Sequence, residues 1–153
     1  MSYEIVMHTA IDILARRRMT IRQITRRLCK KFPDEQPYID RAIERLMEMG
    51  YLDDYAYAQA FARDRMKFRP RGKNFLKLEL LKKGIEKEVI VKALDEIEID
   101  ENAMACVLFE RYKKKTSFLK SKDRRNTLFR YFAQKGISFA AAQAILRENQ
   151  SLF

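Results

Sequence analysis

Apolar positions along the chain recur with a period of 52 residues. Six residues mark the period: Ile24, Leu76 and Leu128 at one place in it, and Leu28, Leu80 and Phe132 four positions later. Two apolar side chains four residues apart lie on one face of a helix, so each pair predicts a helix with a buried face. Threefold repetition of such a unit predicts a tandem array whose neighbouring units share a core.

Capping signals predict where several helices begin and end. Thr20 with Gln23 three residues on forms a capping-box pattern. Gly50 and Gly84 are predicted to end helices in the left-handed conformation, and Ile85 is the apolar residue that a Schellman motif favours after such a glycine. The middle helices are predicted over about 20–31, 73–83 and 124–135. Further N-caps are predicted at Asp53 or Asp54, at Asp123 and at Ser138.

The fold class that follows is all-α. Only four Gly and three Pro interrupt the 153 residues, so the turns that a chain of short strands needs every 8–12 residues are missing. We predict three tandem, helix-turn-helix-like repeats of three helices each, over residues 1–52, 53–99 and 100–153, forming an elongated, curved array.

Charge follows the same period. The formal net charge is +11, which predicts an acidic partner and nucleic acid first of all. Residues 16–31 hold eight basic side chains and no acidic one, 63–83 hold nine and two, and 111–135 hold ten and one. The third helices are acidic instead, with seven acids each in 34–54 and 86–101. Positive charge therefore belongs to the first and second helices of every unit.

We interpret these segments as a basic stripe that contacts a phosphate polymer, since neutralised phosphates release counterions. The alternative is that they are solvated helix faces. Three matching segments favour the binding surface. Its candidate residues are Arg16, Arg17, Arg18, Arg22, Arg69, Arg71, Lys73, Lys77, Lys122, Arg124 and Arg125.

Candidate catalytic and metal-binding residues are sparse. His8 is the only histidine and has no evident partner in the sequence, and adjacent Asp53 and Asp54 suit capping better than acid–base chemistry. Cys29 and Cys106 lie far apart and form no metal motif or disulfide framework. The aromatic candidates for base stacking suit core packing better, and they are Phe61, Phe75, Phe129, Tyr131 and Phe132. We predict no enzyme activity and no cofactor.

The chain is expected to be cytoplasmic, because no apolar run approaches the length of a membrane span and no signal peptide opens the sequence. No membrane partner is expected, and we expect a monomer.

Beyond these patterns, the sequence resembles the RecX family. The similarity lies in GYLDD at 50–54, Phe61, Arg65 and RGKNFLKLELLKKGI at 71–85, and extends more weakly over about 16–146. The motif residues are Gly50, Leu52, Asp53, Asp54, Gly72, Leu76, Glu79, Leu80, Gly84 and Ile85. Phe75 departs from the family pattern, which commonly has a basic residue there.

The resemblance implies a non-enzymatic regulator, most often an inhibitor, of the recombinase RecA in DNA repair, homologous recombination and the SOS response. Such proteins lie along the groove of the RecA filament on single-stranded DNA and impede ATP hydrolysis, filament extension and strand exchange. The expected partners are this filament, the single-stranded DNA within it and free DNA. The alternative left open is a helix-turn-helix-like protein that acts on DNA directly.

Overall fold

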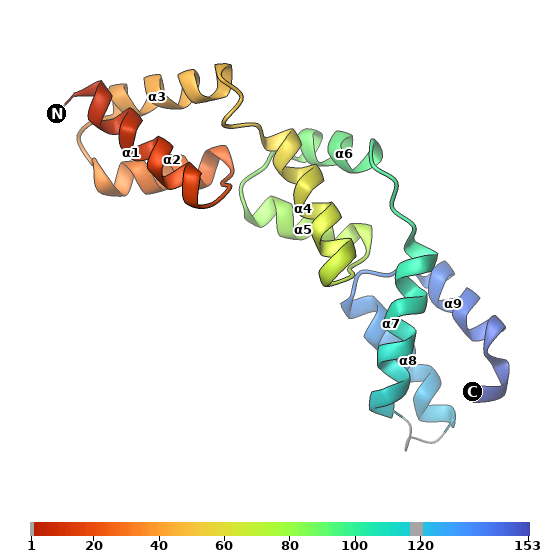
Figure 1. The fold of residues 1–153 in the computed structure, drawn as a ribbon. Coiled ribbons are helices and arrows are strands. Elements are labelled where there is room, and N and C mark those ends of the chain that lie inside the picture. Colours follow the sequence, from red (N-terminus) through yellow and green to blue (C-terminus); the bar gives the residue numbers. More distant parts are fainter. Residues whose placement is uncertain (1, 117–120) are drawn as a thin grey trace. The chain divides into compact units, whose positions relative to one another are not determined.

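The computed structural model describes the backbone of residues 2–116 and 121–153, and the side chains of 2–115 and 123–153. Over these residues the chain forms nine α-helices and a short 3-10 helix with no strand, which confirms the all-α prediction (Figure 1). The elements are α1 (Tyr3–Arg16), α2 (Ile21–Lys31), α3 (Gln36–Glu48), α4 (Asp54–Phe68), α5 (Lys73–Lys82), α6 (Lys87–Asp95), α7 (Glu101–Thr116), α8 (Ser121–Gln134), α9 (Phe139–Glu148) and η1 (Gln150–Leu152).

The 52-residue period is a pattern of burial. All six apolar residues that mark it have 0% of their surface exposed, and they lie in pairs on α2, α5 and α8. In contrast, Leu78 on α5 lies between the two buried leucines of that helix and is 58% exposed. The middle helix of each period is therefore held by one apolar face, as the spacing predicts.

Most of the predicted N-caps are confirmed. Thr20 and Gln23 form both hydrogen bonds of a capping box at α2, and the Ser138 hydroxyl accepts a bond from the Ala141 N–H at α9. Asp53 caps α4 by accepting from the Ala56 N–H at 3.1 Å. The N-cap predicted at Asp123 is wrong, because α8 already begins at Ser121 and Asp123 lies in its first turn.

Three helices end in the same backbone motif. Gly50, Gly84 and Gly136 have φ angles of 79°, 90° and 75°. At Gly84 the glycine N–H donates to Leu81 O, and the following Ile85 N–H reaches back to Leu80 O, the two hydrogen bonds of a Schellman motif. The same pair of bonds follows α3 and α8, so this predicted helix end is confirmed and occurs three times.

The chain forms two compact units, and the first comprises Met1–Ala60 and Glu79–Asp95. Its main core lies between α1, α2 and α3, which pack side by side (Figure 1). The N-terminus of α2 is joined to the later segments: the buried Thr20 hydroxyl donates to Lys83 O at 2.8 Å, and the Ile21 N–H donates to Asp54 Oδ1 at 2.9 Å. Asp54 therefore caps α2 rather than its own helix.

The second unit comprises Phe61–Leu78 and Glu96–Phe153, with its main core between α7, α8 and α9. Here the Gly72 N–H, just before α5, donates to Lys135 O at the end of α8, at 2.7 Å. The Gly72–Lys135 pair and the Thr20–Lys83 pair both span 63 residues, and each joins the start of one middle helix to the end of the next. We call this contact the junction bond. Helices α4 and α5 contribute to both units, and the division into 1–52, 53–99 and 100–153 stays a prediction.

Candidate nucleic-acid interface

The first basic segment forms the turn between α1 and α2. Arg16, Arg17 and Arg18 are exposed, and Arg17 ends α1 in an extended conformation, which turns the chain out of the helix. Burial raises the pKa of the Tyr57 hydroxyl, and the nearby Arg17 cation opposes that rise. This turn therefore presents three cations to solvent, one of them close to Tyr57.

Arg22, another predicted member of the stripe, lies among acidic residues. It lines a pocket of 630 Å³ together with Asp53, Asp54 and Glu86. Its side chain packs against Gly84, where an added Cβ would stand 2.1 Å from Arg22 Cδ. Three acids and Arg26 share this pocket with Arg22, so Arg22 is a weaker candidate for phosphate than the preceding turn.

Arg71, Arg111 and Lys135 lie near Tyr131 in the second unit, and Lys115 lies near Lys135. We call these four cations the anion cluster, because together they favour a bound anion. Partial burial lowers the pKa of Lys135, and the cations of Arg71, Lys115 and Arg111 lower it further. Burial raises the pKa of Tyr131, and the Arg111 and Arg71 cations oppose this rise. Lys135 therefore stands near three other cations, and two of these, Arg71 and Arg111, also stand near the Tyr131 phenol.

Aromatic rings lie beside two of these cations. Lys135 Nζ lies 5.5 Å from the centre of the Tyr131 ring, and the Arg71 guanidinium lies 5.5 Å from that of Phe75. Within the described chain, no ion pair joins a carboxylate to any member of the anion cluster. Like charges gathered without a counterion repel one another, so a bound anion would be favoured at this place.

The fold brings these cations together by the junction bond. Arg111 and Lys115 are one turn apart on α7, Lys135 follows α8, and Arg71 precedes α5. The approach is close: a Cβ on Gly72 would stand 1.7 Å from Gly136 O, and a Cβ on Gly136 would stand 2.6 Å from Phe75 Cβ. Phe75, where the family commonly has a basic residue, is therefore part of the packing that holds Arg71 beside Lys135.

The other predicted stripe residues are dispersed. Arg69 is exposed, whereas Lys73 and Lys77 on α5 are half-buried. Arg124 is half-buried and donates to Leu152 O at 3.3 Å, and its own carbonyl accepts from the Tyr112 hydroxyl, so it helps to hold the C-terminal segment. Arg125 lines a separate pocket of 260 Å³ with Phe153. The side chain of Lys122 lies outside the described residues.

The motif residues of the predicted resemblance have structural positions. Leu52, Leu76, Leu80 and Ile85 are buried, and Glu79 is half-buried. The glycines end helices or allow close approach, and the two aspartates cap α4 and α2. None of these motif residues belongs to the anion cluster.

The prediction of the binding stripe missed Arg111, Lys115 and Lys135. Two signals could have found them. Arg111 and Lys115 have the i, i+4 spacing of one helix face, and Lys135 stands before Gly136 as Lys83 stands before Gly84, at the predicted helix end. Only the fold shows that Arg111 and Lys135 lie near the same tyrosine as Arg71, and that Lys115 lies near Lys135.

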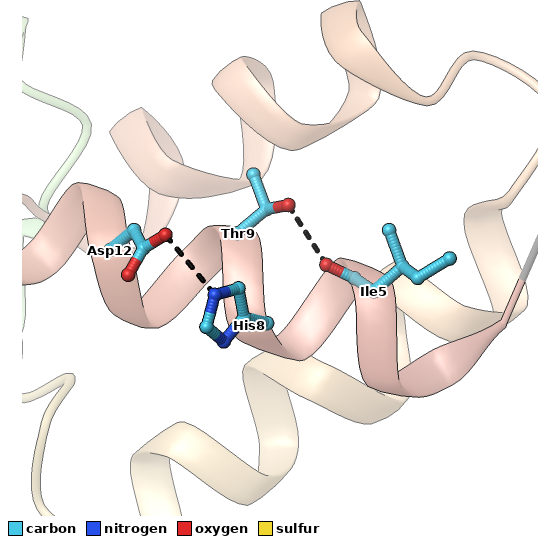
Figure 2. A network of polar contacts seen from close by, with 4 residues as sticks. All are labelled: Ile5, His8, Thr9 and Asp12. Carbon is cyan, nitrogen blue, oxygen red and sulfur yellow. Dashed lines mark hydrogen bonds and ion pairs between the residues drawn. The ribbon is translucent and has the colours of Figure 1, made fainter.

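The histidine has a partner that the sequence analysis did not identify. His8 Nε2 lies 3.4 Å from Asp12 Oδ2, one turn on along α1, and both side chains point outward from the helix (Figure 2). Thr9 beside it donates its hydroxyl to Ile5 O at 2.8 Å. Exposed side chains in an i, i+4 pair match the interpretation of His8 as an ordinary helix residue.

No group of three or more His, Cys, Asp or Glu residues placed to hold a metal ion occurs within the described ranges. Over the same residues, no helix combines the length and apolar character needed to cross a bilayer.

The described residues place the chain among all-helical proteins. Residues 53–94 match the family model described as "RecX, second three-helix domain". The backbone is similar to the crystal structure of RecX from Lactobacillus salivarius, with a TM-score of 0.86, 21% identity and coverage of 97% of each chain.

Sequence relatives are named more specifically. The chain is 34% identical over 129 residues to "Regulatory protein RecX" of Chlorobium phaeobacteroides, covering 83% of this chain and 82% of that protein. It is 32% identical over 143 residues to the protein of the same name from Clostridium botulinum, covering 91% of this chain and 66% of the relative. The chain belongs to the RecX family of regulatory proteins. It spans 54% to 66% of the length of the clostridial relatives that it matches.

Proposed function

We propose that this protein modulates the recombinase RecA by binding along the RecA–single-stranded DNA filament, and that it impedes ATP hydrolysis, filament extension and strand exchange. Membership of the RecX family supports regulation of this recombinase. The anion cluster is the observation that supports a nucleic-acid component, because phosphate is the anion that a filament on DNA presents repeatedly.

Charge in the molecule supports two kinds of contact within such a filament. The basic turn at 16–18 and the anion cluster suit phosphates, which are recognised by cations without regard to sequence. The segments 34–54 and 86–101, which contain α3 and α6, each hold seven acids and two bases and suit a basic protein surface. A protein that contacts both DNA and protein subunits would hold them against the rearrangements of each hydrolysis cycle.

The second candidate is direct action on DNA by a helix-turn-helix-like unit. Sequence-specific readout requires side chains that hydrogen-bond to base edges along a recognition helix. The exposed positions of α5 include Leu78 and Leu81, at 58% and 41%, and leucine makes no such bond. The other exposed positions of α5 are Asn74 and Lys82, so two of its four exposed side chains cannot read a base edge, which supports phosphate contact over base readout.

DNA-dependent ATP hydrolysis by RecA, titrated with the protein, tests this proposal. DNA binding is followed in parallel by the polarisation of a labelled oligonucleotide. A fall in hydrolysis at ratios too low to coat the DNA is expected, since the protein would act on the filament. A fall only when the DNA is coated would reject the proposal in favour of direct binding to DNA.

A matched pair of charge variants tests the anion cluster. Arg111→Gln with Lys115→Gln should lower the slope of log affinity against log salt for single-stranded DNA by about 1.4, at about 0.7 per phosphate contact. Arg45→Gln with Lys87→Gln removes the same net charge from exposed positions on α3 and α6. An equal loss of slope in both variants would show that net charge, and not the cluster, determines DNA binding.

A further inference from the structure

Phe68 is a large apolar side chain exposed at the end of α4. It is 66% exposed, and no large apolar residue in the described part of the chain is more so. The sequence analysis did not include it among the aromatic candidates, all of which are at least half-buried in the structure. A large apolar side chain that is mostly exposed to water is a candidate contact for a binding partner.

One cation lies over this ring, and two more line the pocket beside it. Lys67 Nζ lies 5.3 Å from the centre of the Phe68 ring, and the Arg65 guanidinium lies 5.2 Å from that of Phe61. A pocket of 260 Å³ beside the ring is lined by Phe61, Asp64, Arg65, Phe68 and Arg69. One acid therefore stands among the cations of this segment.

The segment leads directly into the anion cluster. Arg71 is three residues after Phe68, and a chain of three residues spans at most about 11 Å. An exposed aromatic ring beside cations that bind phosphate is the arrangement by which proteins hold single-stranded nucleic acid: the backbone follows the cations, and an unpaired base stacks on the ring.

We propose that Phe68 is a stacking site for one unpaired base, with the phosphates on either side held by Arg69 and the anion cluster. The ring would make the surface selective for single-stranded over duplex DNA, because the bases of a duplex are already stacked on one another. This inference rests on the proposed function only in requiring that the protein bind DNA.

An apolar pocket of a protein partner is the other occupant that an exposed phenylalanine could have. Seating Phe68 in such a pocket would take Lys67 and Arg69 out of water with Asp64 as the one acid beside them, which is costly. A nucleotide supplies both a flat π-face for the ring and a negative charge for those cations. The charge around Phe68 thus favours the nucleotide.

The chain has no tryptophan, so Phe68→Trp introduces a single fluorescent reporter at the proposed site. Phe139→Trp is the matched control: Phe139 is 64% exposed in the same unit, but it stacks on Phe129 at 5.1 Å, and among the described residues no cation lies over its ring. Binding of oligo-dT is followed by polarisation for both variants, and each is compared with the same length of duplex.

Single-stranded DNA should quench the indole fluorescence of the Phe68→Trp variant, and the quenching should saturate at the same DNA concentration as the polarisation signal. Duplex DNA should change this fluorescence little. The fluorescence of the Phe139→Trp variant should respond to neither DNA. Phe68→Ala should weaken binding of single-stranded DNA about 5- to 150-fold, the range expected for one stacked base, while Phe68→Tyr keeps most of the affinity and Phe139→Ala changes it less than about twofold. Thermal melting verifies that each variant is folded.

Three results would overturn the stacking site. If DNA binds with the expected salt dependence but the Phe68→Trp reporter is not quenched and Phe68→Ala binds normally, the interface stands and the stacking site is wrong. If Phe68→Ala loses binding to the RecA filament but not to free single-stranded DNA, Phe68 docks into protein. If no DNA binds to the unchanged chain, the stacking site and the nucleic-acid part of the proposed function fall together.

Discussion

Gly136 and Gly50 allow the helix-end motif to be separated from the junction that is built on it. Both glycines follow a helix in the left-handed conformation, with φ of 75° and 79°. A Cβ on Gly50 would meet nothing within 4 Å, whereas a Cβ on Gly136 would stand 2.6 Å from Phe75 Cβ and 2.9 Å from Phe75 N. Gly→Ala at the two positions thus differs only in what the new methyl group contacts.

The expected cost follows from these surroundings. Alanine in the left-handed region costs about 1–2 kcal/mol, and the stiffer unfolded chain returns about 0.4–1 kcal/mol, so Gly50→Ala should lower the free energy of unfolding by about 1 kcal/mol. Gly136→Ala must also push the start of α5 away from α8. Overpacking adds about 1–3 kcal/mol, and loss of the Gly72–Lys135 bond adds about 1 kcal/mol, for a total of about 3–5 kcal/mol.

Urea unfolding followed by circular dichroism measures both variants against the unchanged chain. Gly136→Ala should unfold at a clearly lower urea concentration than Gly50→Ala, with helical content retained in the absence of urea. Equal midpoints for the two variants would refute the reasoning, because the close approach of α5 and α8 would then contribute nothing to stability.

Three further outcomes can be checked by the same unfolding measurement. Thr20→Val removes the buried hydroxyl that caps α2 and donates to Lys83 O, and should cost about 2–4 kcal/mol; Thr20→Ser keeps both bonds, and an equal loss in the two variants would contradict the role of the hydroxyl. Leu76→Ala should cost about 2–5 kcal/mol and Leu78→Ala less than about 0.5 kcal/mol, so similar costs would contradict the burial period. Burial raises the pKa of Asp54, so the folded chain keeps the proton of this carboxyl to a higher pH than the unfolded chain. The free energy of unfolding should therefore fall relative to that of Asp54→Asn as pH rises from about 4 through the raised pKa. A difference in unfolding free energy between the two chains that stays constant with pH would contradict the raised pKa.

Much of the fold follows from the sequence because its signals are local. The spacing of Ile24 and Leu28 and the threefold repeat of that pair describe one helix face, and glycine after a helix has few alternatives to the left-handed conformation. Where the prediction was wrong, a second local solution existed. Asp123 has the chemistry of an N-cap, but α8 begins two residues earlier, and there Asp123 still favours the positive end of the helix.

The candidate site is less predictable because it depends on contacts between distant segments. Arg71 and Lys135 are 64 positions apart in the sequence, and nothing local to either indicates that they share a tyrosine. The sequence locates basic segments correctly but cannot show that Arg22 stands among carboxylates or that Arg124 holds the C-terminal segment. The packing of the helices determines which cations lie near carboxylates and which lie near other cations.

The junction bond has a consequence for how chain length can change. Because each bond joins a residue to one 63 positions later, and the apolar faces recur every 52 positions, a duplicated stretch of 52 residues brings with it both halves of the contact. An insertion of another length within a middle helix would shift its start away from the glycine turn that receives it. The chain can therefore gain or lose one whole period of 52 residues and still form the junction bond with the residues that it already has.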